Sequence, residues 1–278
     1  MPKIEQEKVL TVLGDPYFGH HTDMHLSRER VKVYDPDRQP PGITEVPPLL
    51  DPSHKCDDCK DMIPAGQPGS GREFLVMHHD MIRVFRYLLN QKGIRFGVKW
   101  DRRNWVKDGH GPDCYAPDSL WDLDDPKKLP QEIRALFSYA DKKYLEQVFR
   151  GVTALVAAPA SGGDPYRDNG PVDKLGAFIE RGVPSGPPRG RGFHNTIHEY
   201  LGSREGRSAT GAEMNKLRKS LFNDYFWSLH LWIDGQFGRL LENLGAPFET
   251  GPEQPGDPMA DMAAMRMATH GRMKPAQP

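Results

Sequence analysis

Two stretches of the sequence decide how the chain folds, because each combines a helical pattern of apolar residues with histidine: Phe193-His194-Asn195-Thr196-Ile197-His198 and Phe226-Trp227-Ser228-Leu229-His230-Leu231-Trp232-Ile233-Asp234. Residues four apart on a helix lie on the same face, so His194 and His198 can bind one metal ion together. His230 adds a third imidazole. Three neutral imidazoles suit copper or zinc, whereas magnesium and calcium prefer oxygen ligands. The plainer interpretation is two helices with ordinary histidines and an aromatic core.

A third segment, further upstream, carries two more histidines: Arg72-Glu73-Phe74-Leu75-Val76-Met77-His78-His79-Asp80-Met81-Ile82-Arg83-Val84-Phe85. Its F-L-x-x-H pattern resembles the first copper motif of the tyrosinase family, and His78 takes the position of that motif's histidine. H-N-x-x-H is similar to the beginning of the family's second copper motif. F-W-x-x-H-x-x-I-D is similar to its end, with His230 as a ligand and Asp234 as the following aspartate. Gly97-Val98-Lys99-Trp100-Asp101 resembles a further P-Y-W-D element, so the resemblance covers about residues 54–245.

The resemblance implies a mainly α-helical fold: a helical bundle that holds a metal centre, with long irregular loops and extended terminal arms. It implies a type 3 copper protein, a monooxygenase or oxidase that uses O₂ to hydroxylate or oxidise a phenol, catechol or aminophenol. A biosynthetic tailoring role fits such an enzyme. The expected ligands of one copper ion are His194, His198 and His230, and those of the other include His78 and His54.

The expected partners are therefore a small phenolic or aminophenolic substrate, O₂ and a copper-delivery protein. Two other functions stay open. One is a mononuclear or atypical metalloenzyme whose first site is incomplete. The other is a non-catalytic relative that binds oxygen or metal.

The first copper site departs from the family pattern. No histidine lies between Ile63 and Met77, where the middle ligand is expected, and the arginine that usually follows the last ligand is His79 here. Several residues could fill the gap: His20, His21 and His25 near the N-terminus, His79 itself, and the pair Cys56 and Cys59. We expect a solvated loop for the N-terminal histidines and a structural role for the cysteines, with metal binding as the alternative. The first site is therefore expected to bind copper more weakly than the second.

The resemblance also implies a proton acceptor. In tyrosinase-like proteins that act on monophenols, an asparagine and an upstream glutamate hold a water that accepts the phenolic proton. Asn195 and Glu180 resemble that pair. A carboxylate beside a metal-bound water is a reasonable general base. The alternative for Glu180 is a surface position on a short amphipathic helix.

The composition argues against several classes of protein. The chain has 37 basic and 38 acidic residues, so no net field favours nucleic acid or an anionic membrane. No stretch approaches the roughly 18 apolar residues needed to cross a bilayer. The charged N-terminus shows no signal peptide, and three cysteines do not make a disulfide framework. We expect a cytoplasmic protein, with partner-assisted export as the alternative.

The chain is expected to have three parts. Residues 1–50 read as an extended arm, residues 51–248 as the tyrosinase-like copper-binding helical domain, and residues 249–278 as a Pro/Gly linker with a Met-rich tail. Few apolar runs alternate with the period of a strand. The spacing of apolar residues instead predicts helices over residues 73–90, a pair within 129–158, 173–181, the stretch with His194 and His198, and 212–244.

Overall fold

The structure, a computed structural model, describes residues 11–12, 21, 25, 28, 62–96, 114–115, 135, 142–159, 162–181, 192–202, 214–215, 220–221 and 223–248. In these residues the protein is mainly α-helical, as predicted. The helices are α3 (Ser70–Gln91), α5 (Lys142–Val156), α6 (Pro171–Arg181), α7 (Phe193–Gly202) and α9 (Asp224–Asn243). Two very short strands, β1 (Arg95–Phe96) and β2 (Cys114–Tyr115), pair in parallel.

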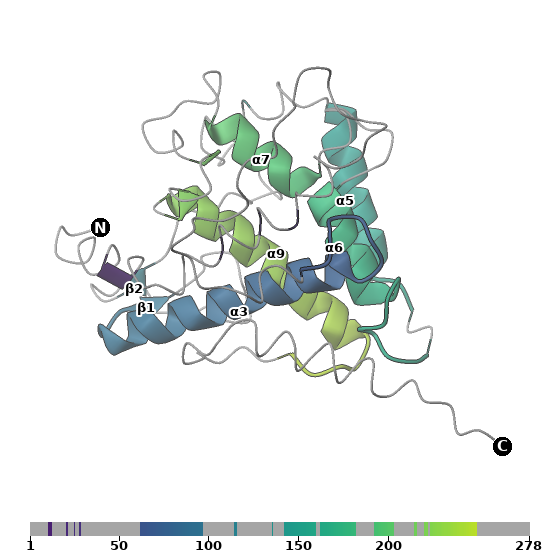
Figure 1. The fold of residues 1–278 in the computed structure, drawn as a ribbon, viewed down its shortest axis with the longest axis horizontal. Coiled ribbons are helices and arrows are strands. Elements are labelled where there is room, and N and C mark those ends of the chain that lie inside the picture. The colour runs from purple at the N-terminus through teal and green to yellow at the C-terminus, as the bar shows by residue number, and fades with distance from the viewer. Residues whose placement is uncertain are drawn as a thin grey trace.

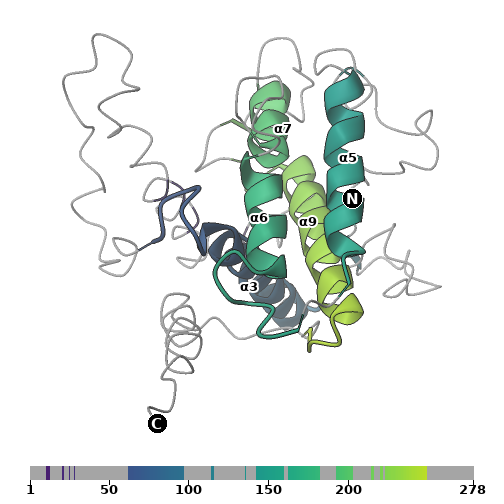
Figure 2. The ribbon, with the colours of Figure 1, turned by 90° about the vertical axis from the view of Figure 1, so that its right-hand side faces the viewer.

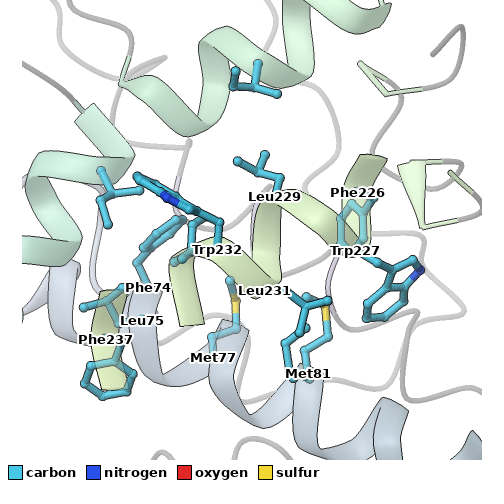
Figure 3. Packing of buried hydrophobic residues seen from close by; sticks show 14 of the residues in the cluster. Phe74, Leu75, Met77, Met81, Phe226, Trp227, Leu229, Leu231, Trp232 and Phe237 are labelled. Carbon is cyan, nitrogen blue, oxygen red and sulfur yellow. The ribbon is translucent and has the colours of Figure 1, made fainter. Parts of the chain in front are cut away.

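The helices form a bundle around one core. Figure 2 shows α5, α6 and α9 side by side, with α3 crossing them. Helix α7 packs against α6 and lies on the far side of α9 from α3 in the view of Figure 1. The side chains of α3 and α9 interdigitate, among them Met77 and Leu231 (Figure 3). Trp227 stacks on Phe85 with ring centroids 3.7 Å apart, so the aromatic residues of α9 serve as core, as expected.

Asp173 joins the beginning of α3 to the beginning of α6. Its buried carboxylate accepts hydrogen bonds from the backbone N–H groups of Gly69, Gly71 and Arg72, at 2.8, 2.8 and 3.1 Å. It also accepts one from the backbone N–H of Asn169, at 2.8 Å, just before α6. The first N–H groups of a helix have no partner within the helix. One carboxylate therefore satisfies donors at both helix ends and fixes them to each other.

Two glycines let α3 and α6 approach closely where they cross. A Cβ atom added at Gly176 would lie 1.8 Å from the backbone oxygen of Gly71. A Cβ atom added at Gly71 would lie 2.0 Å from the backbone oxygen of Asp173 and 2.2 Å from the backbone nitrogen of Ala177. All of these neighbours are backbone atoms, which cannot swing away as a side chain could. The crossing therefore requires glycine on both helices.

The predicted helices around residues 73–90, 173–181 and the H-N-x-x-H motif are confirmed with small changes at their ends. The long helix predicted over residues 212–244 begins later, at Asp224. Its N-cap is Asn223, which has an extended backbone and accepts a hydrogen bond from the N–H of Tyr225 at 2.9 Å. A side-chain cap of this kind starts a helix at a defined residue. A pair of helices was predicted within residues 129–158, and α5 lies where the second of them was expected.

Several sequence predictions fall outside the described residues. They concern most of the N-terminal arm, the Met-rich tail, the G-V-K-W-D element, and the residues His20, His54, Cys56 and Cys59. The domain limits at residues 50 and 248 stay predictions. None of the helices seen in the described part of the chain combines the length and apolar character that a bilayer crossing requires.

We expect Gly176→Ala to lower the free energy of unfolding by about 1–3 kcal/mol, because the added methyl group overpacks a backbone contact. In an ordinary helix the same change would stabilise the protein by about 1 kcal/mol, so the sign of the effect reports the close crossing. Urea unfolding followed by circular dichroism measures it. Gly71→Ala should be destabilising too, and the double variant should lose less than the sum, because one methyl group already separates the helices. A stabilised Gly176→Ala protein would contradict this account.

Candidate metal centre

The imidazoles of six histidines meet inside the bundle: His21, His25, His78, His194, His198 and His230. Their nitrogens make up three groups in which all ligand atoms lie within 4.8 Å of one another. The groups are His21, His78 and His230; His25, His78 and His194; and His194, His198 and His230. Because the groups share members, the six side chains form one assembly rather than separate clusters.

His78 of α3 and His230 of α9 are held in the same way. The Nδ1 atom of His78 lies 2.6 Å from the carbonyl oxygen of Phe74, and that of His230 lies 2.6 Å from the carbonyl oxygen of Phe226. A carbonyl only accepts, so each Nδ1 carries the proton and donates it. Each Nε2 is left with a free lone pair. The two rings stack with centroids 4.6 Å apart and an interplanar angle of 18°, and both side chains are fully buried.

The two histidines of α7 face the same space. His198 donates from Nδ1 to the carbonyl oxygen of Met214 at 2.7 Å. His194 has its Nδ1 3.0 Å from Oδ1 of Asn195, its neighbour in the motif. The Nε2 atom of His194 lies 3.1 Å from Nε2 of His230. The predicted convergence of His194, His198 and His230 is therefore seen in the structure.

His21 and His25 close the assembly from the N-terminal side. Both are buried, so the expectation of a solvated loop is wrong for these two residues. Their Nε2 atoms lie 3.1 Å apart, and the ring of His25 stacks parallel to that of His194 with centroids 5.5 Å apart. The Nδ1 atom of His21 meets no hydrogen-bond partner among the described residues, so no contact there fixes its tautomer.

The arrangement of the nitrogens fits a metal. Within the described residues, the buried Nε2 atoms of His78 and His198 have no hydrogen-bond partner. The Nε2 atoms of His194 and His230 lie 3.1 Å apart and both carry a lone pair when Nδ1 holds the proton. Two such lone pairs repel each other. Two imidazole nitrogens that share an ion at about 2.0–2.1 Å lie at roughly this separation, so a cation between them removes the repulsion.

Burial keeps these imidazoles neutral. Desolvation lowers the pKa of His21 to about 3, with a further contribution from His198, and it lowers the pKa of His198 to about 4 against the opposing effect of the Met214 carbonyl. Desolvation is also the largest cause that holds the pKa of His25, His78, His194 and His230 well below the ordinary value, and neighbouring imidazoles add to it. Neutral imidazole is the form that binds a metal.

A buried ion-pair cluster lies beside the histidines. Arg28 donates from Nε and Nη2 to both carboxylate oxygens of Glu180, at 2.8–3.1 Å. Its Nη1 donates to Glu73 at 2.8 Å. Glu180 is only 6 % exposed, so the alternative of a surface position is wrong for it. The catalytic role predicted for Glu180 and Asn195 stays a prediction, and each of the two has a defined contact: Arg28 for Glu180 and His194 for Asn195.

His79 points away from the assembly. Its Nδ1 lies 2.6 Å from Oδ1 of Asp234, and both side chains are buried. His79 belongs to none of the groups of possible metal ligands in the described residues. It is thus neither a substitute ligand in this arrangement nor a surface residue. Asp234 of α9 therefore contacts His79 of α3, and this contact joins the two helices.

Sequence reasoning favoured a solvated loop for His21 and His25, and it did not single out Arg28. A local signal was present, because His21 and His25 are four residues apart, the same spacing as His194 and His198. His21, His25 and Arg28, the described residues of this segment, all have helical backbone geometry. The second occurrence of H-x-x-x-H was therefore a sign that the N-terminal histidines could join the buried histidine groups.

Comparisons of the chain with family models, with curated proteins and with solved structures found no match. The described part of the structure shows a mainly helical protein with buried histidine groups that could hold metal.

We expect the stability of the metal-free protein to fall as the pH drops below about 6.5, the ordinary pKa of histidine in an unfolded chain. The folded-state pKa values are lowered, so unfolding takes up protons in this range, whereas above it neither state does. Each histidine that stays neutral in the folded state contributes about 1.4 kcal/mol per pH unit to the slope. Urea unfolding between pH 5 and pH 8 measures it. A flat profile below pH 6.5 would show that the imidazoles are hydrated.

The pair of His79 and Asp234 is expected to be structural. Asp234→Ala leaves a buried imidazole N–H without its acceptor, which should lower the free energy of unfolding by about 1–3 kcal/mol. The number of metal ions bound per chain should not change, because neither residue faces the six histidines. Unfolding curves and metal analysis of the same preparation test both parts. Loss of bound metal from the folded variant would contradict the assignment.

Proposed function

We propose that the chain is a copper-dependent oxidoreductase of the tyrosinase type, which uses O₂ to hydroxylate or oxidise a small phenol, catechol or aminophenol, as in a biosynthetic tailoring step. One observation carries the proposal. Six imidazoles turn their free nitrogens toward a shared buried space, and backbone carbonyls hold Nδ1 of His78, His198 and His230. Imidazole ligands without carboxylates favour copper or zinc over harder ions. The order of the sequence motifs favours copper between these two.

The six histidines divide into two sets of three in this proposal. His194, His198 and His230 bind one ion, as the motifs predict. His78 would hold the other together with His21 and His25, which would take the places that the family pattern left empty. Each of these two shares a group of possible ligands with His78, and the groups also include His230 and His194, so the two ions would be neighbours. His54 is not needed as a ligand in this assignment, and its role stays a prediction.

Copper bound in this centre would supply one-electron redox chemistry and reactivity with O₂. The chain supplies the conditions for it. Burial keeps the imidazoles neutral, and the carbonyl oxygens of Phe74 and Phe226 orient two of them. The rings of the same phenylalanines lie against His78 and His230, with centroids 4.3 and 3.9 Å apart, and exclude water from that side. A dry site protects a reactive oxygen species from side reactions.

Asn195 and Glu180 are assigned to proton handling in this proposal. Asn195 contacts Nδ1 of His194, which orients that ring and sets its tautomer. Glu180 would accept the phenolic proton through a water. Both of its oxygens also accept hydrogen bonds from Arg28, and this contact competes with a role as base.

The metal content separates this proposal from its alternatives. The purified chain should bind two copper ions, and His198→Ala should bind one, because His198 belongs to a single ligand group. The variant should lose oxygen consumption with phenol, catechol and 2-aminophenol altogether. His79→Ala is the matched control, since its side chain faces Asp234, and it should keep two ions. One ion per wild-type chain would indicate a mononuclear enzyme, and none would indicate a non-catalytic protein.

Glu180→Gln tests the proton acceptor, because it keeps the shape of the side chain and removes its basicity. Losing a general base costs about 10²–10⁴-fold in rate. Turnover of a monophenol should fall by about that factor, whereas oxidation of a catechol, which ionises more readily, should fall much less. Both rates are followed by oxygen consumption at measured copper content. Equal losses on the two substrates would rule out a role specific to monophenols.

A further inference from the structure

Arg28 is the most completely enclosed charged residue in the described part of the chain. Only 1 % of it is exposed, and its guanidinium lies between two carboxylates from different helices, Glu73 of α3 and Glu180 of α6. Nη2 also donates to the carbonyl oxygen of Ser70 at 2.7 Å, where α3 begins. A guanidinium presents its donors in a fixed planar fork, so this set of contacts specifies one position and one orientation.

The backbone of Arg28 is fixed as well. Its carbonyl oxygen accepts a hydrogen bond from the N–H of Ala65 at 3.2 Å. Glu73 in turn accepts a hydrogen bond from the N–H of Ile63 at 2.9 Å, so the segment before α3 joins the same network. Arg28 therefore connects an N-terminal segment both to the residues just before α3 and to α6.

Arg28 follows His25 by three residues and His21 by seven. All three residues have helical backbone geometry, and all three side chains are buried. Because so few residues separate them along the chain, contacts that fix Arg28 against α3 and α6 also restrict where the imidazoles of His25 and His21 can lie. They are presented to His78, whose ring centroid lies 5.6 Å from that of His25 and 6.0 Å from that of His21.

We propose that Arg28, paired with Glu73 and Glu180, is the positioning residue that holds His21 and His25 at the first metal ion. The inference rests on the proposed two-metal function and goes beyond it, because it assigns a role to residues that bind no metal. It also gives Glu180 a purpose other than proton transfer. The carboxylate holds the guanidinium that is proposed to fix two ligands, in addition to its proposed part in proton transfer.

The electrostatics agree with this role. A cation near His25 and His194 disfavours protonation of their imidazoles, and Arg28 adds to desolvation in holding the pKa of both histidines below the ordinary value.

The experiment measures copper binding at each site separately. In His198→Ala the second site is disabled, and copper(II) titration against a competing chelator reports the first site. In His21→Ala the same titration reports the second. Adding Arg28→Met to His198→Ala should weaken the remaining site about 10–100-fold, the usual effect of losing a residue that orients ligands. Adding it to His21→Ala should change the affinity by less than about threefold. Arg28→Lys, which keeps the charge but not the fork, should give an intermediate loss at the first site.

Arg72→Met is the matched control. Arg72 is also a buried arginine at the beginning of α3, and it pairs with Asp168 and the carbonyl oxygen of Tyr166. Its loss removes an ion pair at the same end of α3 without touching the N-terminal histidines, although the carboxylate of Asp168 is 47 % exposed, whereas those of Glu73 and Glu180 are buried. It should leave both copper affinities unchanged. Hydrogen exchange of metal-free protein gives a second readout: Arg28→Met should speed exchange in peptides that contain residues 21–28 and leave α9 protected.

The outcomes separate the inference from the proposed function. Two copper ions in the wild-type chain, with equal first-site affinity in Arg28→Met and in its parent, would overturn the role of Arg28 alone. Losses of equal size at both sites would also overturn it, since they would mean general destabilisation. A wild-type chain that binds no copper would overturn both. Should Arg28→Met fail to fold, Arg28→Lys carries the test, and full first-site affinity in that variant would overturn the role of the guanidinium fork.

Discussion

The close crossing of α3 and α6 is the constraint on which the rest of the structure depends. Gly71 and Gly176 bring the two backbones into contact, and the carboxylate of Asp173 fixes their ends in register. Glu73 lies two residues beyond the first glycine and Glu180 one turn beyond the second. The crossing thus places two carboxylates, from segments far apart in the sequence, around one guanidinium. A wider crossing would separate them and leave a buried arginine with one partner.

This dependence links the stability of the fold to its chemistry. Six neutral imidazoles in a dry interior lose their hydration, and their unpaired nitrogens gain little from the protein itself. Burying these imidazoles without a cation therefore costs free energy, and other interactions in the bundle must offset that cost. The packing of α3 on α9, the ion pairs of Arg28 and the backbone hydrogen bonds to Asp173 contribute to this offset. A metal ion that binds only the folded state would then stabilise the whole protein.

Much of the fold was predictable because it is local. The apolar spacing and the caps of α3, α6 and α7 lie within their own residues, and so does the histidine pair of α7. The start of α9 was not predicted: the helix begins at Asp224, after Asn223, which has an extended backbone and accepts a hydrogen bond from the N–H of Tyr225. The spacing of His21 and His25 was visible in the sequence, but their burial depends on contacts with distant parts of the chain. Neighbouring Arg28 illustrates this, because its partners are 45 and 152 residues away.

The centre can be understood as two similar halves. In the proposed assignment, each half combines an H-x-x-x-H pair with one histidine that follows a phenylalanine by four residues: His194 and His198 with His230, and His21 and His25 with His78. The first of these sets is one of the groups of possible ligands, whereas His21 and His25 each share a separate group with His78. In both halves the single histidine donates its Nδ1 proton to the carbonyl of that phenylalanine, so its ring is oriented by its own helix. The halves differ in how the pair is held. α7 packs directly on α6, whereas Arg28, three residues after His25, connects the N-terminal segment to α3 and α6. In the role proposed for Arg28, the half with His21, His25 and His78 is the one whose geometry depends on a single side chain.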